Sequence, residues 1–486
     1  MAFVAVCVFL AGMEFDRSEI AGFFDREVPV LLEKFDIPGA VLSFVSNGEV
    51  LYVNGYGVAD LDSGREMEED SLVRIGSVSK LFTWISIMQL YEQGRIDLKA
   101  DVNNYISAFK IPDAFKKAIT VENLLTHTTG FEEQASQIIQ FLGYEPGPLV
   151  EELKDIPERV LEPGRFAAYS NYGSGVAGHI VEQVSGMEFS DYVDRNIIDR
   201  LQMKSTTFDQ QLSDDLLARM STGYYYENGQ NIFLTPFEII VLPPAGSASS
   251  SAGDMAKFMI ANLQKGRFGD ERILNEETAE LMQSVHFQHD TRLNGMCYGF
   301  YEMSRNGIRL IGHGGDTILF HTLTVLAPEE DWGLFVSFNS IGSGPARDEL
   351  LASLMDNYYP YEKAYDPYKE SLIERIRVTG DYINNRRVYS DFWESLNYWR
   401  NPDIRVDITA GGSLSIGGSE WTAVEPNLVL SEKNKLAAFR REGAEVHLFV
   451  DSAPMLAFEK VPWYLSQRFV GSMFMALVMG LFMVLP

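Results

Sequence analysis

Segments that read as β-strands stand at both ends of a long region whose middle reads as helical. Residues 37–60 place β-branched and aromatic residues around a Ser-Asn-Gly turn, and so predict strand, turn and strand. Strand-like sequence returns late in the region, at residues 307–315 and 332–340. Strands at both ends with helices between them predict an α+β domain over residues 14–360, whose sheet is closed by the two ends of the domain.

Three segments of the middle region have helical spacing, namely residues 78–93, 175–184 and 254–264. In the first of them, Leu81, Ile85 and Met88 lie along one face, and Gly94 is a typical helix stop. Hydrophobic residues make up 46% of the chain, which is enough for a packed core.

The pattern changes after a tyrosine-rich stretch, and this change predicts a second domain. Residues 361–377 are expected to form a linker. Beyond them, short strands alternate with turn signals up to Trp463. This rhythm is typical of a small antiparallel barrel or sandwich, here over residues 378–463.

The two ends of the sequence are strongly apolar. Residues 1–13 resemble the hydrophobic part of a secretory signal without its basic start, and a core strand or helix is the alternative. Residues 468–486 carry no charge after Arg468 and follow an aromatic pair, so they predict a C-terminal transmembrane helix, with a buried helix as the alternative. Together the ends predict a cell-membrane protein whose main domain is extracytoplasmic.

Charge and cysteine content limit the choice of partners. The formal net charge of −28 argues against nucleic acid as a partner, because the phosphate backbone repels an acidic protein. Two cysteines, Cys7 and Cys297, do not form a disulfide framework. Neither a dinucleotide fingerprint nor a phosphate-binding glycine loop occurs, so no cofactor is expected.

Ser77 and Lys80 stand three residues apart at the predicted start of the first helix. Residues at i and i+3 share a helix face, so the Lys80 amine can reach the Ser77 hydroxyl. Burial lowers the pKa of a lysine and allows it to act as a base toward a serine nucleophile. The alternative is an N-cap serine followed by an ordinary lysine.

Tyr169 and Asn171 lie two residues apart in a predicted loop, from which both side chains can enter a cleft. The phenol can relay a proton and the amide can orient a substrate carbonyl. The alternative is an ordinary loop before a helix, with Asn171 as the helix cap.

His313, Gly314 and Gly315 end an apolar strand-like segment. Two glycines allow a substrate backbone to lie close to the strand edge and leave main-chain N–H groups exposed. The backbone N–H of Asp316 can then form an oxyanion hole with that of Ser77. A turn residue or a metal ligand is the alternative for the histidine. Metal is disfavoured, because the only ligand-type spacing among the histidines is His286-x-x-His289, without supporting carboxylates.

The order of the three motifs, S-x-x-K, Y-x-N and H-x-G, resembles the serine β-lactamase and penicillin-binding-protein superfamily, and more closely its class-C-like branch of carboxypeptidases, D-aminopeptidases and esterases. The segments YEQGRIDLKADVNNYI, ITVENLLTHTTGF and LPPAGSASSSAGDMAKFM are also similar to that branch. The resemblance implies an antiparallel sheet flanked by helices, with a helical subdomain. It further implies a lipocalin-like barrel and a terminal membrane segment, both of which some members carry.

The resemblance also implies roles for the motif residues. By position, Ser77 is the nucleophile, Lys80 its base, Tyr169 the residue that passes a proton to the leaving group, and Asn171 the amide that orients the substrate. His313 stands where β-lactamases have the lysine of K-T-G. His127 and Thr128 belong to a recognisable H-T-T-G segment and are interpreted as scaffold.

These roles predict a serine hydrolase that forms an acyl-enzyme with a small-molecule ester, a peptide or a cell-wall-type substrate. A histidine at position 313 is usually neutral, whereas a lysine holds a substrate carboxylate, so β-lactams and D-Ala-D-Ala peptides are disfavoured. The alternative is a membrane-tethered protein of the same fold with little turnover, acting as a penicillin-binding sensor or forming filaments. The sequence leaves the substrate and the oligomeric state open.

Overall fold

The computed structural model describes residues 13–133, 138–141, 144–227, 229–233, 238–361, 368, 372–390, 402–466, 469 and 472–473 of the 486-residue chain. Within these residues, seven strands form an antiparallel sheet in the order β12-β13-β14-β15-β1-β2-β3. Their bounds are Gly39–Ser46 (β1), Glu49–Asp60 (β2), Arg65–Glu66 (β3), Tyr301–Glu302 (β12), Ile311–Asp316 (β13), His321–Ala327 (β14) and Trp332–Phe338 (β15).

The first strand of the sheet pairs with the last along its length. Ala40 lies opposite Phe338 and Ser46 opposite Trp332, so the two ends of the domain meet in the middle of the sheet. Every residue of β1 is buried, because both of its faces are covered. The predicted α+β domain, with a sheet closed by its two ends, is therefore confirmed.

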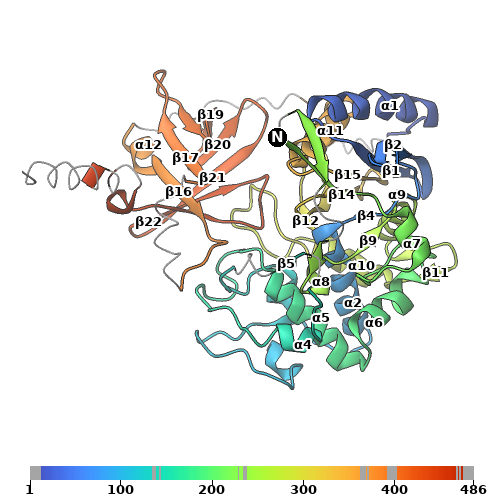
Figure 1. Ribbon diagram of the computed structural model, residues 1–486. Helices are drawn as coiled ribbons and strands as arrows, with labels where there is room; N and C mark the ends of the chain where they lie inside the picture. Colours follow the sequence, from blue (N-terminus) through green and yellow to red (C-terminus); the bar gives the residue numbers. More distant parts are fainter. Residues whose placement is uncertain are drawn as a thin grey trace, which may run out of the picture.

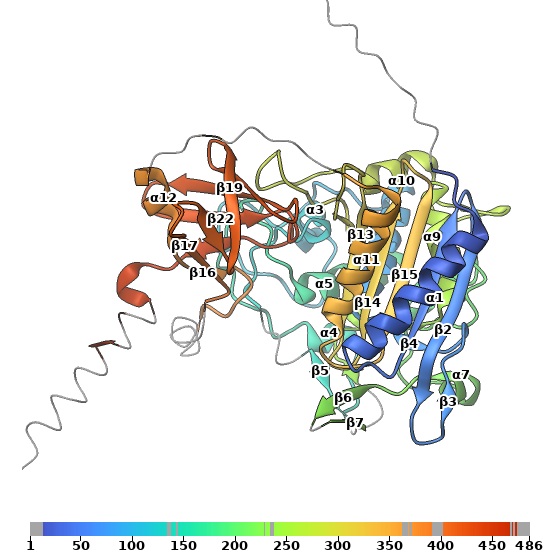
Figure 2. The same ribbon diagram turned by 90° about the horizontal axis from the view of Figure 1, so that it is seen from above.

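Helices cover both faces of this sheet. One face packs under α1 (Arg17–Lys34) and α11 (Gly344–Tyr358), which lie side by side in Figure 2. The other face packs against α9 (Ala252–Leu263) and the helical subdomain. The remaining helices of the domain are Lys80–Glu92 (α2), Val121–Leu125 (α3), Leu149–Glu152 (α4), Asn171–Ser185 (α5), Phe189–Val193 (α6), Asp214–Arg219 (α7), Pro243–Gly246 (α8) and Glu276–Gln283 (α10).

In the described part of the α+β domain, four pairs of short strands lie outside the main sheet. They are Val73–Arg74 (β4) with Ser249–Ser250 (β9), Ile139–Gln140 (β5) with Ile239–Ile240 (β8), Tyr224–Glu227 (β6) with Gln230–Phe233 (β7), and Arg267–Phe268 (β10) with Glu271–Arg272 (β11). The first pair places the segment before Ser77 beside the segment that follows α8.

Helix α2 begins later than its sequence pattern predicts. Residues Gly76–Ser79 form a turn of 3-10 helix (η1), and α2 starts at Lys80. All its residues from Lys80 to Leu90 are buried, because helices and sheet surround it. The predicted stop is confirmed, since Gly94 adopts a left-handed conformation with φ 70° directly after the helix.

The second domain is a closed antiparallel barrel, drawn in orange and red beside the α+β domain in Figure 1. Its described strands are Gly380–Asn384 (β16), Ile404–Ile408 (β17), Leu414–Ile416 (β18), Ser419–Glu425 (β19), Leu428–Ser431 (β20), Leu436–Glu442 (β21), Glu445–Val450 (β22) and Phe458–Lys460 (β23). Strand β23 pairs with β16 and closes the barrel. The prediction of a small all-β barrel is confirmed, and helix α12 (Leu372–Val378) occupies the end of the expected linker.

The barrel packs directly against the α+β domain. Phe166 and Leu293 of that domain share an apolar cluster with Leu428, Ala438 and Phe449 of the barrel. Three ion pairs border this cluster among the described residues: Arg165 to Glu442 at 2.8 Å, Arg165 to Glu445 at 3.3 Å and Arg292 to Glu425 at 3.0 Å. The two domains therefore share a core as well as a polar rim.

Both predicted terminal segments lie almost entirely outside the described residues. Of the signal-like segment 1–13 only Met13 is described, and of the predicted transmembrane helix 468–486 only residues 469, 472 and 473. Among the helices of the described part, none combines the length and the apolar character that crossing a bilayer requires. The structure gives the predicted transmembrane helix no support.

Candidate active site

Ser77 lies in the tight turn between β4 and α2. Gly76 adopts φ 51°, and a Cβ there would lie 2.9 Å from the backbone nitrogen of Asp316, so only glycine allows this turn to touch β13. The Ser79 hydroxyl holds the turn, because it donates to the Gly76 carbonyl at 2.6 Å and accepts from the Ala248 N–H at 3.0 Å. Ser77 is thus fixed at the start of α2, beside the end of β13.

Lys80 is completely buried directly behind Ser77. Its Nζ lies 3.1 Å from Ser77 Oγ, 2.7 Å from Asn171 Oδ1 and 2.6 Å from the Ala245 carbonyl. A neutral amine donates its two N–H groups to the last two and directs its lone pair to Ser77. Burial lowers the pKa of Lys80 well below its ordinary value, and the charge of Arg386 lowers it further. The sequence therefore placed the serine and the amine correctly within reach of each other.

Tyr169 precedes α5 and points its ring at the same site. The Lys80 Nζ lies 4.8 Å from the ring centroid. Among the described residues, the buried phenol oxygen has no hydrogen-bond partner. Burial raises the pKa of Tyr169 above its ordinary value, and the adjacent Ser77 hydroxyl offsets only part of this effect. The phenol is therefore protonated at neutral pH and free to exchange a proton within the site.

His127 supports the loop that carries Tyr169. The two ring centroids lie 4.4 Å apart, and His127 Nδ1 accepts a hydrogen bond from the Ser170 N–H at 3.2 Å. Thr128 lies further from the reaction site, where its hydroxyl bonds Asn123 and Thr126. Ser170, not Asn171, caps α5, because its hydroxyl accepts from the Gly173 N–H. Asn171 is the first residue of the helix and its oxygen holds Lys80.

His313 is buried in β13 facing the same site. Its Nδ1 lies 2.6 Å from the Gly314 carbonyl, so this nitrogen carries the proton and donates it there. Burial, with a further effect of the Lys80 charge, lowers the pKa of His313 to about 3. The ring is therefore neutral at physiological pH, as expected for this position.

The two glycines of β13 serve the packing of the strand more than a substrate. The predicted exposure of the Gly314 N–H is wrong, because this group donates to the Tyr301 hydroxyl at 2.7 Å. A Cβ on Gly315 would lie 2.0 Å from the Ile75 carbonyl. Gly315 is needed where β13 approaches the segment before Ser77. Gly314 alone of the two borders the cavity described below.

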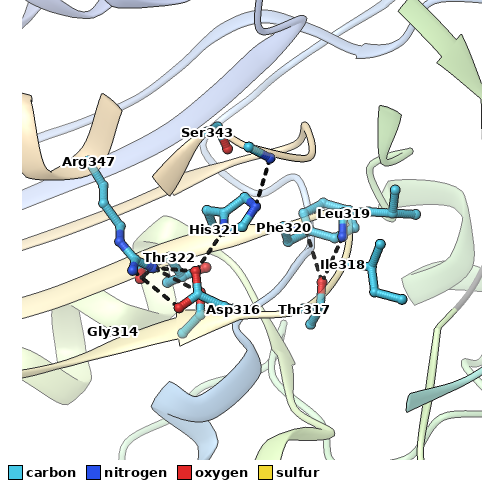
Figure 3. A network of polar contacts seen from close by, with 12 residues as sticks. Gly314, Asp316, Thr317, Ile318, Leu319, Phe320, His321, Thr322, Ser343 and Arg347 are labelled. Carbon is cyan, nitrogen blue, oxygen red and sulfur yellow. Dashed lines mark hydrogen bonds and ion pairs between the residues drawn. The ribbon is translucent and has the colours of Figure 1, made fainter. Parts of the chain in front are cut away.

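Asp316 ends β13 with its backbone against Gly76 and its carboxylate held on two sides (Figure 3). Arg347 donates to it through Nη1 at 2.7 Å and Nη2 at 3.1 Å, and His321 Nδ1 lies at 2.6 Å. His321 Nε2 accepts from the Gly342 N–H, so Nδ1 carries the proton and donates it to Asp316. Burial raises the pKa of the Asp316 carboxyl, but His321 and Arg347 outweigh it and lower the pKa overall.

These residues border a cavity of about 460 Å³, referred to below as the active-site cavity. Ser77, Tyr169, Asn171 and His313 line one part of it. The barrel contributes another part of the wall, through Arg386, Ser452, Met455 and Leu456. The active-site cavity thus lies between the two domains, which the sequence did not predict.

Arg386 is a residue of the site that sequence reasoning missed. It follows β16, its guanidinium carbon lies 4.8 Å from the Tyr169 ring centroid, and its Nε donates to Glu133 Oε2 at 2.8 Å. The local sequence NNRRVY offers no spacing that distinguishes this arginine from a surface residue. Only the packing of the barrel brings it to Tyr169 and the active-site cavity.

The histidines at 286 and 289 have separate surroundings. His286 stacks on Tyr298 with ring centroids 3.5 Å apart, and His289 stacks on Phe449 of the barrel at 4.5 Å. His289 Nε2 accepts from the Ala167 N–H at 3.1 Å, which ties it to the loop of Tyr169. The i,i+3 spacing of this pair reflects packing against two different partners.

Comparison with known proteins assigns most of the α+β domain to a known family. The Beta-lactamase family matches residues 24–356. Protein flp of Staphylococcus aureus (strain MRSA252) is 23% identical over 380 residues, which are 76% of this chain and 68% of that protein. Esterase EstB of Burkholderia gladioli is 30% identical over 207 residues, which are 40% of this chain and 53% of the esterase.

Two solved structures share the fold over most of the chain, and a third shares it over about two thirds. The octameric penicillin-binding protein homologue from Pyrococcus abyssi covers 92% of this chain with all of its own, at a TM-score of 0.60 and 20% identity. SurE covers 92% with 99% of its own chain, at 0.62 and 19% identity. A class C β-lactamase from Rhodobacter sphaeroides covers 69% with 98% of its own, at 0.57 and 24% identity.

Proposed function

The chain belongs to the Beta-lactamase family, and we propose that it is a serine hydrolase that cleaves an ester or a peptide-type amide through an acyl-enzyme. One observation carries this proposal: the buried Lys80 Nζ lies 3.1 Å from Ser77 Oγ, with its pKa lowered. The lowered pKa favours the neutral amine, which at hydrogen-bond distance can accept the serine proton, as an activated nucleophile requires.

The proposed reaction has two steps. Ser77 Oγ attacks the substrate carbonyl carbon and gives its proton to Lys80. The tetrahedral oxyanion is bound by the backbone N–H groups of Ser77 and Asp316. The proton then reaches the leaving group through the Tyr169 phenol, and the bond to the leaving group breaks. Water attacks the acyl-enzyme, transfers a proton back along the same residues and releases the acid together with free Ser77.

Asn171 and His313 also line the active-site cavity and are proposed to bind substrate. Asn171 is held by Lys80 and borders the cavity, where it can orient a carbonyl group. His313 is neutral and offers no charge to a substrate carboxylate. The neutral His313 therefore disfavours β-lactam hydrolysis and fits an esterase or D-aminopeptidase activity, whereas a carboxypeptidase activity requires a cation elsewhere in the cavity.

Labelling with a fluorophosphonate, combined with a hydrolysis screen, tests the proposal. We expect the probe to label the wild-type protein and not Ser77→Ala, and p-nitrophenyl esters or D-amino-acid peptides to be turned over only by the wild type. Equal labelling of both proteins would contradict a Ser77 nucleophile. A stable adduct without turnover would instead indicate a sensor.

We also propose that residues 468–486 tether the enzyme to a membrane, with the catalytic domain outside the cytoplasm. The support is the uncharged apolar sequence after Arg468 and the exposed Trp463 and Tyr464 before it. Carbonate extraction of membranes tests this: the full chain should stay in the membrane pellet, and a chain ending at residue 466 should not.

A further inference from the structure

Two arginines border the active-site cavity, and they differ in how their charges are used. Arg347 donates from both Nη atoms to Asp316 and also from Nη1 to the Thr322 carbonyl at 3.0 Å. Its charge is therefore occupied by the protein itself. Of these two arginines, Arg386 is therefore the one whose charge can bind a substrate.

Arg386 is held in place through one edge of its guanidinium only. Its Nε donates to the buried carboxylate of Glu133, and its backbone N–H donates to Asn384 Oδ1 at 3.0 Å. Among the described residues, neither of its Nη atoms has a hydrogen-bond partner. The side chain is 34% exposed, although it lies against Tyr169 at the cavity wall. Two N–H groups on each Nη thus remain available at the cavity wall beside Tyr169.

We propose that Arg386 is the anion-binding residue of the active site, and that the preferred substrates carry a carboxylate on the leaving group. This inference rests on the proposed hydrolase function. Free Nη atoms of one arginine form the planar fork that recognises a carboxylate with two hydrogen bonds. Arg386 lies over the ring of Tyr169, the residue proposed to protonate the leaving group, which places the anion on that side of the scissile bond.

The barrel thereby supplies the cation that β13 lacks. His313 is neutral, so the strand offers no charge at the place where the resemblance leads one to expect a lysine. Arg386 reaches the same cavity from the other domain. A carboxylate-bearing ester or peptide is then bound without any cation on β13, and substrate choice depends on the barrel.

A structural role is the alternative: the pair of Arg386 and Glu133 also bridges the two domains. A matched pair of esters, 3-acetoxybenzoate and 3-acetoxybenzamide, separates the two roles. The leaving group of the first carries a carboxylate, and that of the second carries a neutral carboxamide at the same position. The proteins are the wild type, Arg386→Gln, Arg386→Lys and, as a control, Arg441→Gln, which changes an exposed arginine of the same barrel.

We expect kcat/KM of the wild type to be at least 10-fold higher for the benzoate than for the benzamide, because hydrogen bonds between charged groups are about twice as strong as neutral ones. Arg386→Gln should lose this preference, so that the ratio of kcat/KM for the benzoate to that for the benzamide falls to about 1. The lost effect of its charge on the Lys80 pKa acts on both esters alike and cancels in this ratio. Arg386→Lys should retain part of the preference and Arg441→Gln all of it. An equal loss on both esters, or a preference that survives Arg386→Gln, would overturn the proposal.

Binding of the two esters to Ser77→Ala, which lacks the nucleophile, tests the anion site independently of the hydrolase proposal. Absence of turnover and of fluorophosphonate labelling would refute the proposed function alone. Calorimetric titration of Ser77→Ala should show at least 10-fold tighter binding of the benzoate than of the benzamide, and adding Arg386→Gln should abolish the difference. Equal dissociation constants, or no binding of the benzoate at millimolar concentration, would refute an anion site at Arg386.

Discussion

At the scale of single residues, Lys80 connects the proposed chemistry to its surroundings. Its amine lies within hydrogen-bond distance of Ser77, Asn171 and the Ala245 carbonyl, so three different segments hold it at the nucleophile. Burial and the charge of Arg386 both lower its pKa. A lysine that is charged at neutral pH cannot accept the serine proton, and the lowered pKa removes this obstacle.

We therefore expect Lys80→Met to reduce the rate of acylation at least about 100-fold, because the general base is lost while the buried side chain keeps a similar size. In the wild type, kcat/KM should fall toward acid pH as Lys80 becomes protonated, with a midpoint well below the ordinary pKa of lysine. Stopped-flow acylation across a pH series measures both effects. A near-normal rate for Lys80→Met would remove this residue from the mechanism.

The motif itself was predictable from sequence because its two members lie on adjacent turns. In a helical turn, the i,i+3 spacing brings Ser77 and Lys80 together without any contact from distant segments. Asn171 and Ala245 reach the same amine from 91 and 165 residues away, and no local pattern reports such contacts. Arg386 escaped prediction for the same reason, since it comes from another domain.

At the scale of elements, the end of β13 is fixed by its neighbours β14 and α11. His321 of β14 and Arg347 of α11 hold the carboxylate of Asp316, whose backbone N–H is proposed to bind the oxyanion (Figure 3). The sequence placed Asp316 at a strand end. It did not indicate that its side chain would be paired, because both partners belong to later elements.

Arg347→Met should loosen this strand end and lower kcat about 10-fold with KM almost unchanged, because the oxyanion forms only in the transition state. Arg347→Lys should recover part of the loss. The control is Glu349→Gln, which removes an exposed ion pair to Lys34 from the same helix and should leave kcat unchanged. Steady-state kinetics on a p-nitrophenyl ester measures these effects, and a proportional rise in KM would speak against a positioning role.

At the scale of the whole molecule, the barrel and the α+β domain meet around a buried histidine. His289 stacks on Phe449, accepts from the Ala167 N–H, and its carbonyl accepts from Arg440 Nη1 at 3.2 Å. Burial, aided by the charges of Arg440 and His447, lowers the pKa of His289 to about 3. The unfolded chain, with an ordinary histidine pKa near 6.5, binds more protons between these values. Stability contributed by His289 is thus complete above pH 6.5 and lost as the pH falls toward 3.

Acidification from pH 7.5 to 5.0 should therefore lower the free energy of unfolding of the wild type by about 2 kcal/mol more than that of His289→Gln. Glutamine keeps an acceptor for the Ala167 N–H and does not titrate. Comparing the two proteins cancels the contribution of His127 and His313, which are also buried with lowered pKa values. Urea unfolding monitored by tryptophan fluorescence at both pH values measures the difference, and parallel pH dependence in the two proteins would contradict the assignment.

Sequence pattern predicted both domains but not the way they meet. Turn signals and short strands define the barrel locally, and the spacing of apolar residues defines the helices. Neither reports which surfaces touch, because Phe166 and Phe449 read as ordinary core residues of their own domains. The wall that the barrel contributes to the active-site cavity was for that reason not foreseen.

The pairing of β1 with β15 also dictates when the protein can fold during its synthesis. β1 ends at Ser46, but its partner is complete only at Phe338, so the ribosome adds about 290 residues between them, which takes about 15–60 s at usual rates. Until then the edge of β1 that β15 covers in the folded protein has no partner. Because an unpaired strand edge can pair with another chain, we expect chains released before Phe338 to aggregate more readily than the complete protein.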